Sequence, residues 1–285
     1  MVDSLGEVRV GHWTSPGERT GCTVVVFPEG TVASGEVRGG APATREFELL
    51  DPRRLVEHVD AVVLTGGSAF GLATADGVVG WLADNDRGFR THSGPVPIVV
   101  AMALFDLDPE VVRPGAQQGA EAARAATPGV PISGRVGAGA GATIGKWRGV
   151  HEARPGGLGV AVVRSGEVTV TAVVAVNAAG DIDDGSVAAD IVAGRFVPPT
   201  VAESSFENTT IGVLWTNAAA DKVGCRLLAE SGHDGLGRAL LPAHTQTDGD
   251  AIVAASTGRV DAALSTVRIM AVVAVEQAVR SVESG

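Results

Sequence analysis

The sequence TVTAVVAV, residues 169–176, predicts a β-strand that is buried on both of its faces. Successive strand residues point to opposite sides of a sheet, and here both sides are apolar or β-branched, whereas a sheet with one wet face alternates apolar with polar residues. Ser165-Gly166 supplies a turn before it, so residues 157–163 and 167–177 are expected to form a hairpin. The sheet that contains this hairpin must therefore be covered on both sides.

The rest of the chain intersperses strands with helices. Short β-prone runs at 7–10, 22–27 and from 31 onwards predict antiparallel strands, and 60–65 predicts a buried strand that ends in a glycine turn at Gly66-Gly67. Other expected elements are helices over 69–82 and 116–126, an apolar run at 96–107, a strand at 209–216, and helices at about 219–228 and over 261–282.

The segment 178–205 is typical of an exposed, mobile connection, because it mixes Asp, Gly and Ala with Pro198-Pro199. The strand expected after it is apolar enough to belong to the sheet before it. We therefore expect one domain over residues 1–285.

Composition excludes several classes of protein. The chain has 285 residues, of which 45% are hydrophobic and 19% charged, so it has enough apolar material for a packed core. A net charge of −11 opposes binding to nucleic acid or to an anionic membrane surface. No secretory signal is visible, the apolar runs are too short to span a membrane, and two cysteines make no disulfide framework, so a cytoplasmic location is expected.

The most unusual stretch is RVGAGAGATIGK, residues 135–146, which ends in Lys146, one of only two lysines in the chain. A phosphate-binding loop of the Walker type requires Gly at the position of Ala140 and Ser or Thr at the position of Trp147, so that function is not predicted. Two interpretations stay open: a tight loop in which backbones approach closely with Lys146 in solvent, or a loop that places Lys146 at the edge of a pocket.

The junction Asn208-Thr209 marks an abrupt change from a polar segment to a buried strand. Asn capping a turn before a strand is one interpretation. The other is chemical: if the peptide bond between them is cut, Thr209 carries a free α-amine beside its own hydroxyl, and this amine is a base within reach of the nucleophile.

A resemblance decides between these interpretations. Six segments in order, RGGAPATRE (38–46), LTGGSAFGL (64–72), VGAGAGATIGK (136–146), VNAAGD (176–181), NTTIG (208–212) and DGD (248–250), resemble the L-aminopeptidase/D-esterase family, which includes β-peptidyl aminopeptidases and nylon-oligomer hydrolases. The resemblance implies a mixed α/β fold, a four-layer αββα sandwich, and a precursor that cuts itself before a Ser or Thr.

Carried over to this chain, the resemblance implies a cut between Asn208 and Thr209, which gives fragments 1–208 and 209–285 with Thr209 as the nucleophile. It also implies roles for four other residues. Lys146 would contact the hydroxyl of the nucleophile, and Asn177 would stabilise the oxyanion. Asp248 and Asp250 would hold the new ammonium group.

We expect neither a metal nor a cofactor. Asp248 and Asp250 lack the further oxygen ligands of hard-cation loops, and the six histidines show no metal-ligand spacing. The chain has no Tyr, whereas members of the family place a Tyr hydroxyl near the pocket, so Phe105 is expected there instead.

Other pocket candidates are Ser68, on a strand-to-helix turn, and Trp215 and Phe206, which flank the expected cut.

The sequence thus predicts a threonine hydrolase, an aminopeptidase or amidase, that acts on small peptides or peptide-like amides and assembles as a homo-oligomer, a tetramer or larger. Two alternatives stay open. One is an acyltransferase of the ornithine acetyltransferase type, and the other is an unprocessed small-molecule binding protein on the same fold.

Overall fold

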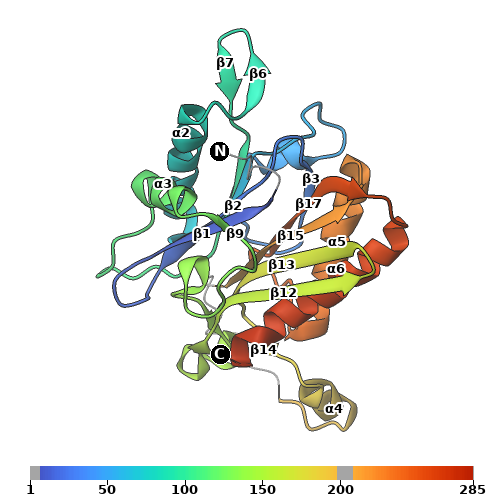
Figure 1. Ribbon diagram of the computed structural model, residues 1–285. Helices are drawn as coiled ribbons and strands as arrows, with labels where there is room; N and C mark the ends of the chain where they lie inside the picture. The colour runs from blue at the N-terminus through green and yellow to red at the C-terminus, as the bar shows by residue number, and fades with distance from the viewer. Residues whose placement is uncertain (1–6, 198–207, 285) are drawn as a thin grey trace.

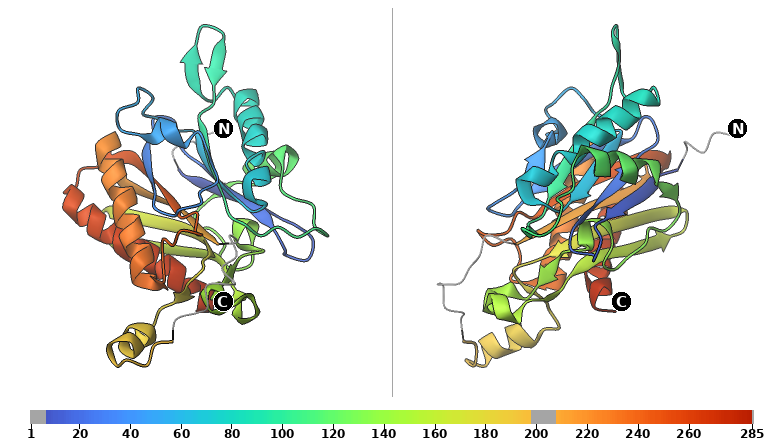
Figure 2. Two further views of the ribbon diagram at one scale, coloured as in Figure 1. Left: turned by 180° about the vertical axis from the view of Figure 1, so that it is seen from behind. Right: turned by 90° about the vertical axis from the view of Figure 1, so that its left-hand side faces the viewer.

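A computed structural model of the protein describes residues 7–197 and 208–284. Two β-sheets pack face to face, and each sheet carries helices on its outer face (Figure 1). Figure 2 shows the same four layers from behind and from the side. The expected αββα sandwich is confirmed.

The first sheet has six strands in the order β4-β8-β5-β2-β1-β9. Their bounds are Thr44–Arg45 for β4, Val99–Ala103 for β8, Ala61–Thr65 for β5, Gly21–Val26 for β2, Arg9–Thr14 for β1 and Thr127–Pro128 for β9. Only β5 and β8 run parallel, and the other neighbours in this sheet are antiparallel. The carboxyl ends of β5 and β8 therefore meet at one edge, where ligand sites form in parallel sheets.

The second sheet has five strands in the order β12-β13-β15-β17-β3. Their bounds are Gly157–Ser165 for β12, Val168–Asn177 for β13, Thr209–Ala218 for β15, Ala251–Val260 for β17 and Val32–Val37 for β3. The expected hairpin is present as β12 and β13, which pair from Gly157↔Val176 to Ser165↔Val168. Gly166 takes a positive φ of 57° in its turn, a conformation that glycine adopts without a steric penalty.

Six α-helices and three two-stranded ribbons lie outside the two sheets in the described ranges. The helices are α1 (Ser68–Gly71), α2 (Thr74–Asp84), α3 (Ala116–Arg124), α4 (Ser186–Val192), α5 (Lys222–Ala239) and α6 (Leu264–Arg280). The ribbons are β6 (Phe89–Thr91) with β7 (Gly94–Val96), β10 (Thr143–Ile144) with β11 (Arg154–Pro155), and β14 (Asp181–Ile182) with β16 (Leu240–Leu241). The β6–β7 ribbon projects beyond the two sheets (Figure 1).

Three apolar clusters hold the four layers together. On β13, Val173 and Ala175 point into the cluster between the two sheets, whereas Val170 and Val174, on the opposite face of the strand, pack against α5 and α6. A third cluster joins the six-stranded sheet to α2 and α3. Each fully buried Val or Leu side chain contributes roughly 1.5–3 kcal/mol. The double-sided burial of 169–176 is therefore confirmed, and its cause is a sheet on one side and helices on the other.

Two predicted helices need correction, and two features of the sheets were not predicted. The helix expected over 69–82 is divided into α1 and α2 at Leu72-Ala73, and the helix expected to end near residue 228 continues as α5 to Ala239. β17 was not predicted, because a short apolar run such as 251–255 does not by itself distinguish a strand from a buried helix. β3 leaves its sequence neighbours β1 and β2 and pairs with β17 in the other sheet.

The segment expected to be an exposed connection, 178–205, contains β14 and α4 in its described part. Residues 198–207 lie outside the described residues, and this range includes Pro198, Pro199 and Phe206. Within the described ranges, no helix is both long and apolar enough to cross a membrane.

Candidate active site

Thr209 is the first residue of β15, and it is buried with 4% of its surface exposed. Its hydroxyl donates a hydrogen bond to the carbonyl oxygen of Asn208, the residue before it in the chain. By the alternation of β15, Thr209 lies on the side of Ile211 and Val213, which face the six-stranded sheet. The hydroxyl and the preceding carbonyl are therefore adjacent at one end of the space between the sheets.

Asn177 lies directly opposite Thr209 across β13 and β15. Directly paired residues in an antiparallel ladder place their Cβ atoms about 4.5–5.5 Å apart on the same face. The side chain of Asn177 is fixed on both sides: Oδ1 accepts a hydrogen bond from the backbone N–H of Thr143 at 3.0 Å, and Nδ2 donates to the carbonyl of Phe105 at 3.0 Å. The Asn177 side chain is thus held in place on the same face of the sheet as Thr209.

Lys146 reaches the same place from the glycine-rich segment. Its Nζ donates to Oδ1 of Asn177 at 2.9 Å and to the carbonyl oxygen of Asn177 at 3.3 Å, and 6% of the residue is exposed. The glycines explain this approach, since a Cβ at Gly139 would lie 2.0 Å from the backbone N of Leu158. The segment is therefore a tight loop against neighbouring backbone, and it also buries Lys146 at the edge of a pocket.

Asp248 and Asp250 lie beneath the start of β15. Oδ1 of Asp250 accepts the backbone N–H of Thr210 at 2.7 Å, and Oδ2 of Asp248 accepts the hydroxyl of Thr245 at 2.6 Å. Burial, together with the charge of Asp250, raises the pKa of Asp248. The described residues contain no group of three or more His, Cys, Asp or Glu side chains that could hold a metal ion.

Gly249, between the two aspartates, packs directly on the nucleophile candidate. A Cβ at this position would lie 2.7 Å from Oγ1 of Thr209 and 2.7 Å from the carbonyl oxygen of Ala41. Real Cβ atoms do not make contacts this short, so glycine is required if Thr209 is to keep this position.

A pocket of about 270 Å³ opens beside Lys146. Its lining includes Phe105, together with charged side chains and smaller residues: Arg19, Asp106, Leu107, Asp108, Arg135, Gly141 and Thr143. Burial raises the pKa of Asp106 to about 6, although its Oδ1 accepts the backbone N–H of Gly67 at 2.6 Å. The pocket is therefore small and polar, with charges of both signs.

Two predicted pocket residues lie elsewhere. Trp215 is six residues along β15 from Thr209, which is about 20 Å on an extended strand, and it lines a different pocket of about 400 Å³. Trp215 was expected in the pocket because it is close to the expected cut in the sequence. On an extended strand, however, each successive residue lies farther from the first one. Ser68 begins α1 with a positive φ of 53°, and among the described residues it does not line the pocket beside Lys146.

His244 is one of the six histidines that lack metal-ligand spacing in the sequence, but the structure places it against Asp250, with Nδ1 2.8 Å from Oδ2. Its position six residues before Asp250 was the available signal, although spacing alone does not show which way a loop turns.

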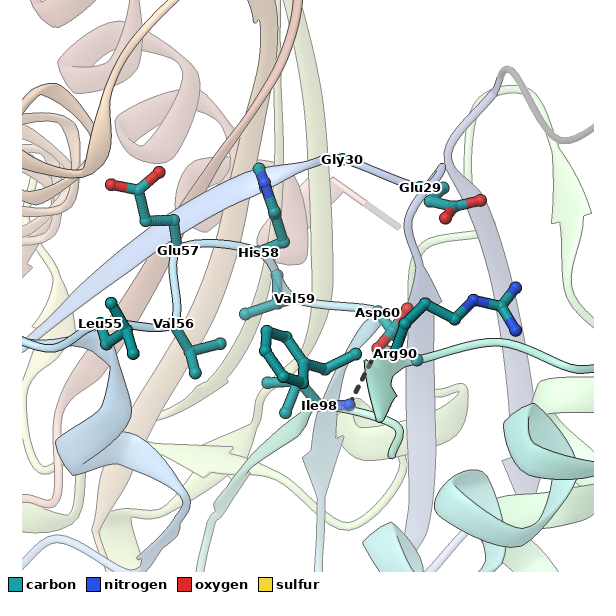
Figure 3. A pocket seen from close by; sticks show the side chains of 12 residues that line it. Glu29, Gly30, Leu55, Val56, Glu57, His58, Val59, Asp60, Arg90 and Ile98 are labelled. Carbon is teal, nitrogen blue, oxygen red and sulfur yellow. Dashed lines mark hydrogen bonds between the residues drawn. The ribbon is translucent and has the colours of Figure 1, made fainter. Parts of the chain in front are cut away.

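A further pocket of about 280 Å³ lies at the opposite end of β5 and β8 (Figure 3). Asp60, just before β5, accepts the backbone N–H of Ile98 at 2.8 Å there, and Leu55, Val56 and Arg90 also line it. Ile98 precedes β8 and Asp106 follows it, so this pocket and the one beside Lys146 lie at opposite ends of the strands of the six-stranded sheet.

The chain is similar to known proteins along most of its length. A model of the family described as peptidase family S58 matches residues 3–283. An uncharacterized aminopeptidase of Mycobacterium bovis is 42% identical over 291 residues, which cover 91% of this chain and 82% of that protein. A 6-aminohexanoate-oligomer endohydrolase of Agromyces sp. is 31% identical over 267 residues, which cover 85% of this chain and 70% of that enzyme.

Two solved structures share the fold. A beta-aminopeptidase of Burkholderia sp. superposes with a TM-score of 0.71 at 22% identity, over 98% of this chain and 85% of that one. The L-aminopeptidase D-Ala-esterase/amidase of Ochrobactrum anthropi, described as a variant of the Ntn hydrolase fold, superposes with a TM-score of 0.68 at 20% identity, over 96% and 82% of the two chains.

Proposed function

Because this chain belongs to peptidase family S58 and is therefore a hydrolase, we propose that it processes itself at Asn208-Thr209 and then cleaves amide bonds of small peptides or peptide-like amides through an acyl-enzyme on Thr209. One observation carries the proposal. The Thr209 hydroxyl lies against the carbonyl of Asn208 at the buried start of β15, opposite the side chain of Asn177.

The first step of self-processing involves two groups that are already in contact, the Thr209 hydroxyl and the Asn208 carbonyl. Oγ1 of Thr209 attacks the carbonyl carbon of Asn208, the C–N bond breaks, and the α-nitrogen of Thr209 takes up a proton, which leaves an ester between the two residues. Water then hydrolyses the ester. The products are a carboxylate on Asn208 and a free α-amine on Thr209, in the same residue as the hydroxyl that it activates.

Turnover repeats this chemistry on a substrate. The α-amine of Thr209 accepts the hydroxyl proton while Oγ1 attacks the scissile carbonyl, and the proton passes to the leaving amine as the acyl-enzyme forms. Water attacks the ester in the second half of the cycle, and its proton passes through the α-amine to Oγ1, which leaves as the free hydroxyl. The reference pKa of an α-amine, about 7.7–8.0, suits a base that works near neutral pH.

Asn177 stabilises the negative charge that develops on the carbonyl oxygen. The Asn177 amide is held between Lys146, Thr143 and Phe105, so it does not have to reorganise during the reaction. A single donor of this kind contributes about 2.7–4 kcal/mol to stabilisation of a transition state. Lys146 is proposed to contact the hydroxyl of Thr209. Its hydrogen bond to Oδ1 of Asn177 holds the ammonium group close to the residue that pairs with Thr209.

The pocket beside Lys146 supports a short, polar substrate. Its volume of about 270 Å³ and its charges of both signs suit the charged end of a small peptide or amide better than a long apolar chain. The names of the relatives point to related bonds, since they describe aminopeptidases and the hydrolysis of 6-aminohexanoate oligomers.

Intact-mass measurement of the purified protein tests the proposal. We expect fragments of residues 1–208 and 209–285 that stay together under native conditions. Thr209→Ala should remain whole and inactive towards an amino-acid anilide, whereas the matched variant Thr209→Ser should be cut and active. An active Thr209→Ala variant, or an active chain in which the bond is intact, contradicts the proposal.

A second measurement separates hydrolysis from acyl transfer. With an amine acceptor added at increasing concentration, a hydrolase releases mainly the free acid, whereas a transferase passes the acyl group to the acceptor. We expect the free acid to predominate.

A further inference from the structure

His244 lies in the connection between β16 and β17, with its backbone in the left-handed region at a φ of 56°. This conformation is uncommon for a residue other than glycine, and it persists where surrounding contacts determine it. Both the backbone N–H and the ring contact the same carboxylate oxygen. Oδ2 of Asp250 is 3.1 Å from the backbone N of His244 and 2.8 Å from its Nδ1.

Asp250 transmits this contact to the reacting strand. Its side chain is 2% exposed, and Oδ1, the oxygen that His244 does not contact, accepts the backbone N–H of Thr210 at 2.7 Å. The peptide group that carries this N–H also contains the carbonyl of Thr209. A rotation of the Asp250 carboxylate would therefore displace the residue whose hydroxyl reacts.

The second ring nitrogen of His244 is also held. Nε2 is 3.4 Å from the carbonyl oxygen of His233 on α5, and the rings of the two histidines meet edge to face with centroids 4.9 Å apart. Each ring nitrogen of His244 thus faces an oxygen that can only accept, and only a doubly protonated imidazole donates to both. The imidazolium also balances part of the charge of Asp250 and Asp248.

The charged surroundings agree with this protonation state. Burial lowers the pKa of His244, but the hydrogen bond and charge of Asp250 outweigh burial and raise it above its ordinary value. The other groups that act on His244 are His233, whose own pKa burial lowers to about 4, and Arg38 after β3. His233 is therefore neutral near pH 7, and Asp250 is the partner that decides the charge of His244.

We propose that His244 is a positioning residue for the reaction at Thr209: it fixes the Asp250 carboxylate, and Asp250 fixes the start of β15. This role deepens the proposed function and rests on it. His244 is not among the described residues that line the pocket beside Lys146, so its effect is on the geometry of the nucleophile rather than on substrate binding.

The test compares His244→Ala with His244→Asn. Alanine removes both ring donors, whereas the asparagine amide can place a donor close to the position of Nδ1. We expect His244→Ala to lower the rate of self-cleavage and kcat at least tenfold with KM changed less than twofold, and His244→Asn to recover kcat to within threefold of the wild type. His92→Ala, at an exposed histidine in the turn between β6 and β7, is the matched control and should behave like the wild type.

The pH profile adds a measurement that a purely structural role would not change. The imidazolium is present below the folded-state pKa of His244 and is lost above it, so the ratio of the wild-type rate to the His244→Asn rate should fall as the pH rises through that pKa. Thermal unfolding shows whether each variant is folded. If His244→Ala does not fold, the rate and pH profile of His244→Asn carry the test.

A double-mutant cycle completes the experiment. In an Asp250→Asn background, His244→Ala should cause less than a twofold further loss, because the residue acts through that carboxylate. Wild-type rates in His244→Ala, equal losses in His244→Ala and His244→Asn, or fully additive losses with Asp250→Asn each overturn the inference. An uncleaved wild type or an active Thr209→Ala variant would instead overturn the proposed function, so the two failures are distinguishable.

Discussion

The two lysines of this chain are both buried, but their surroundings differ. Lys222, at the first turn of α5, donates to three backbone carbonyl oxygens of residues 49–56, at 2.9 Å to Leu49, 3.1 Å to Arg54 and 2.6 Å to Val56. Lys146 donates to a side-chain amide, that of Asn177, and lines the pocket that also contains Asp106.

The difference shows how burial alone fails to identify a reactive lysine. Three carbonyl acceptors match the three donors of an ammonium group, so Lys222 ties the segment 49–56 to α5 and presents nothing to a ligand. The acceptors of Lys146 belong to Asn177, which is paired with Thr209, and Lys146 itself lines a pocket. We therefore expect a structural role for Lys222 and a role in the proposed reaction for Lys146. Two of the three variants below test this expectation, and the third tests an acidic residue of the same pocket.

The largest effect is expected from Lys146→Met. Methionine fills a similar volume but removes the ammonium group, so we expect self-cleavage and kcat to fall roughly 10²–10³-fold, as when one donor to a developing charge is lost. Stability should change little, since Oδ1 of Asn177 keeps the backbone N–H of Thr143 at 3.0 Å. Rates come from intact-mass time courses and from hydrolysis of an amino-acid anilide, and a wild-type rate would remove Lys146 from the reaction.

A pH-dependent effect is expected from Asp106→Asn in the same pocket. Because burial raises the pKa of Asp106 to about 6 in the folded state, its contribution to stability is fully present below about pH 3.8 and is lost as the pH rises through 6. The free energy of unfolding of the wild type relative to Asp106→Asn should therefore fall by about 2 kcal/mol between pH 4 and pH 7. Denaturant unfolding at several pH values measures this difference in the free energy of unfolding. If the free energies of the two proteins change with pH in parallel, the pKa of Asp106 in the folded state is ordinary.

The smallest effect is expected from Lys222→Met, and it should be on stability alone. Three carbonyl groups lose a charged donor, and an unpaired buried polar group costs about 1–3 kcal/mol. We expect the free energy of unfolding to fall by this amount while self-cleavage and kcat stay within twofold of the wild type. A variant as stable as the wild type, or one that loses activity while it stays folded, would contradict the comparison with Lys146.

The sequence predicted most of the layers and the ends of several strands. The unbroken apolar character of 169–176 is enough to require cover on both sides, and the hairpin follows from the turn at Ser165-Gly166. It did not predict β17, whose five apolar residues also suit a helix, or the departure of β3 to the second sheet, because strand pairing depends on partners far away in the chain.

The sequence likewise identified some residues of the candidate site and missed others. Thr209, Lys146, Asn177, Asp248 and Asp250 were named from ordered motifs, and the structure brings them together, although their roles stay predictions. Trp215 was misplaced, since nearness in sequence was taken for nearness in space. His244 and Asp106 were not assigned to the site, because neither lies in a motif with recognisable spacing.

The sequence by itself determined the local chemistry: which strands are apolar on both faces, where glycine permits close approach, and which residue has a hydroxyl directly after the proposed cleavage junction. Only the tertiary structure decided which side chains lie next to one another. Contacts between segments far apart in the chain set Asn177 opposite Thr209, link His244 to Thr210 through the Asp250 carboxylate, and distinguish the two buried lysines. The energy of such contacts depends on the distance between the groups in space and not on their separation in the sequence.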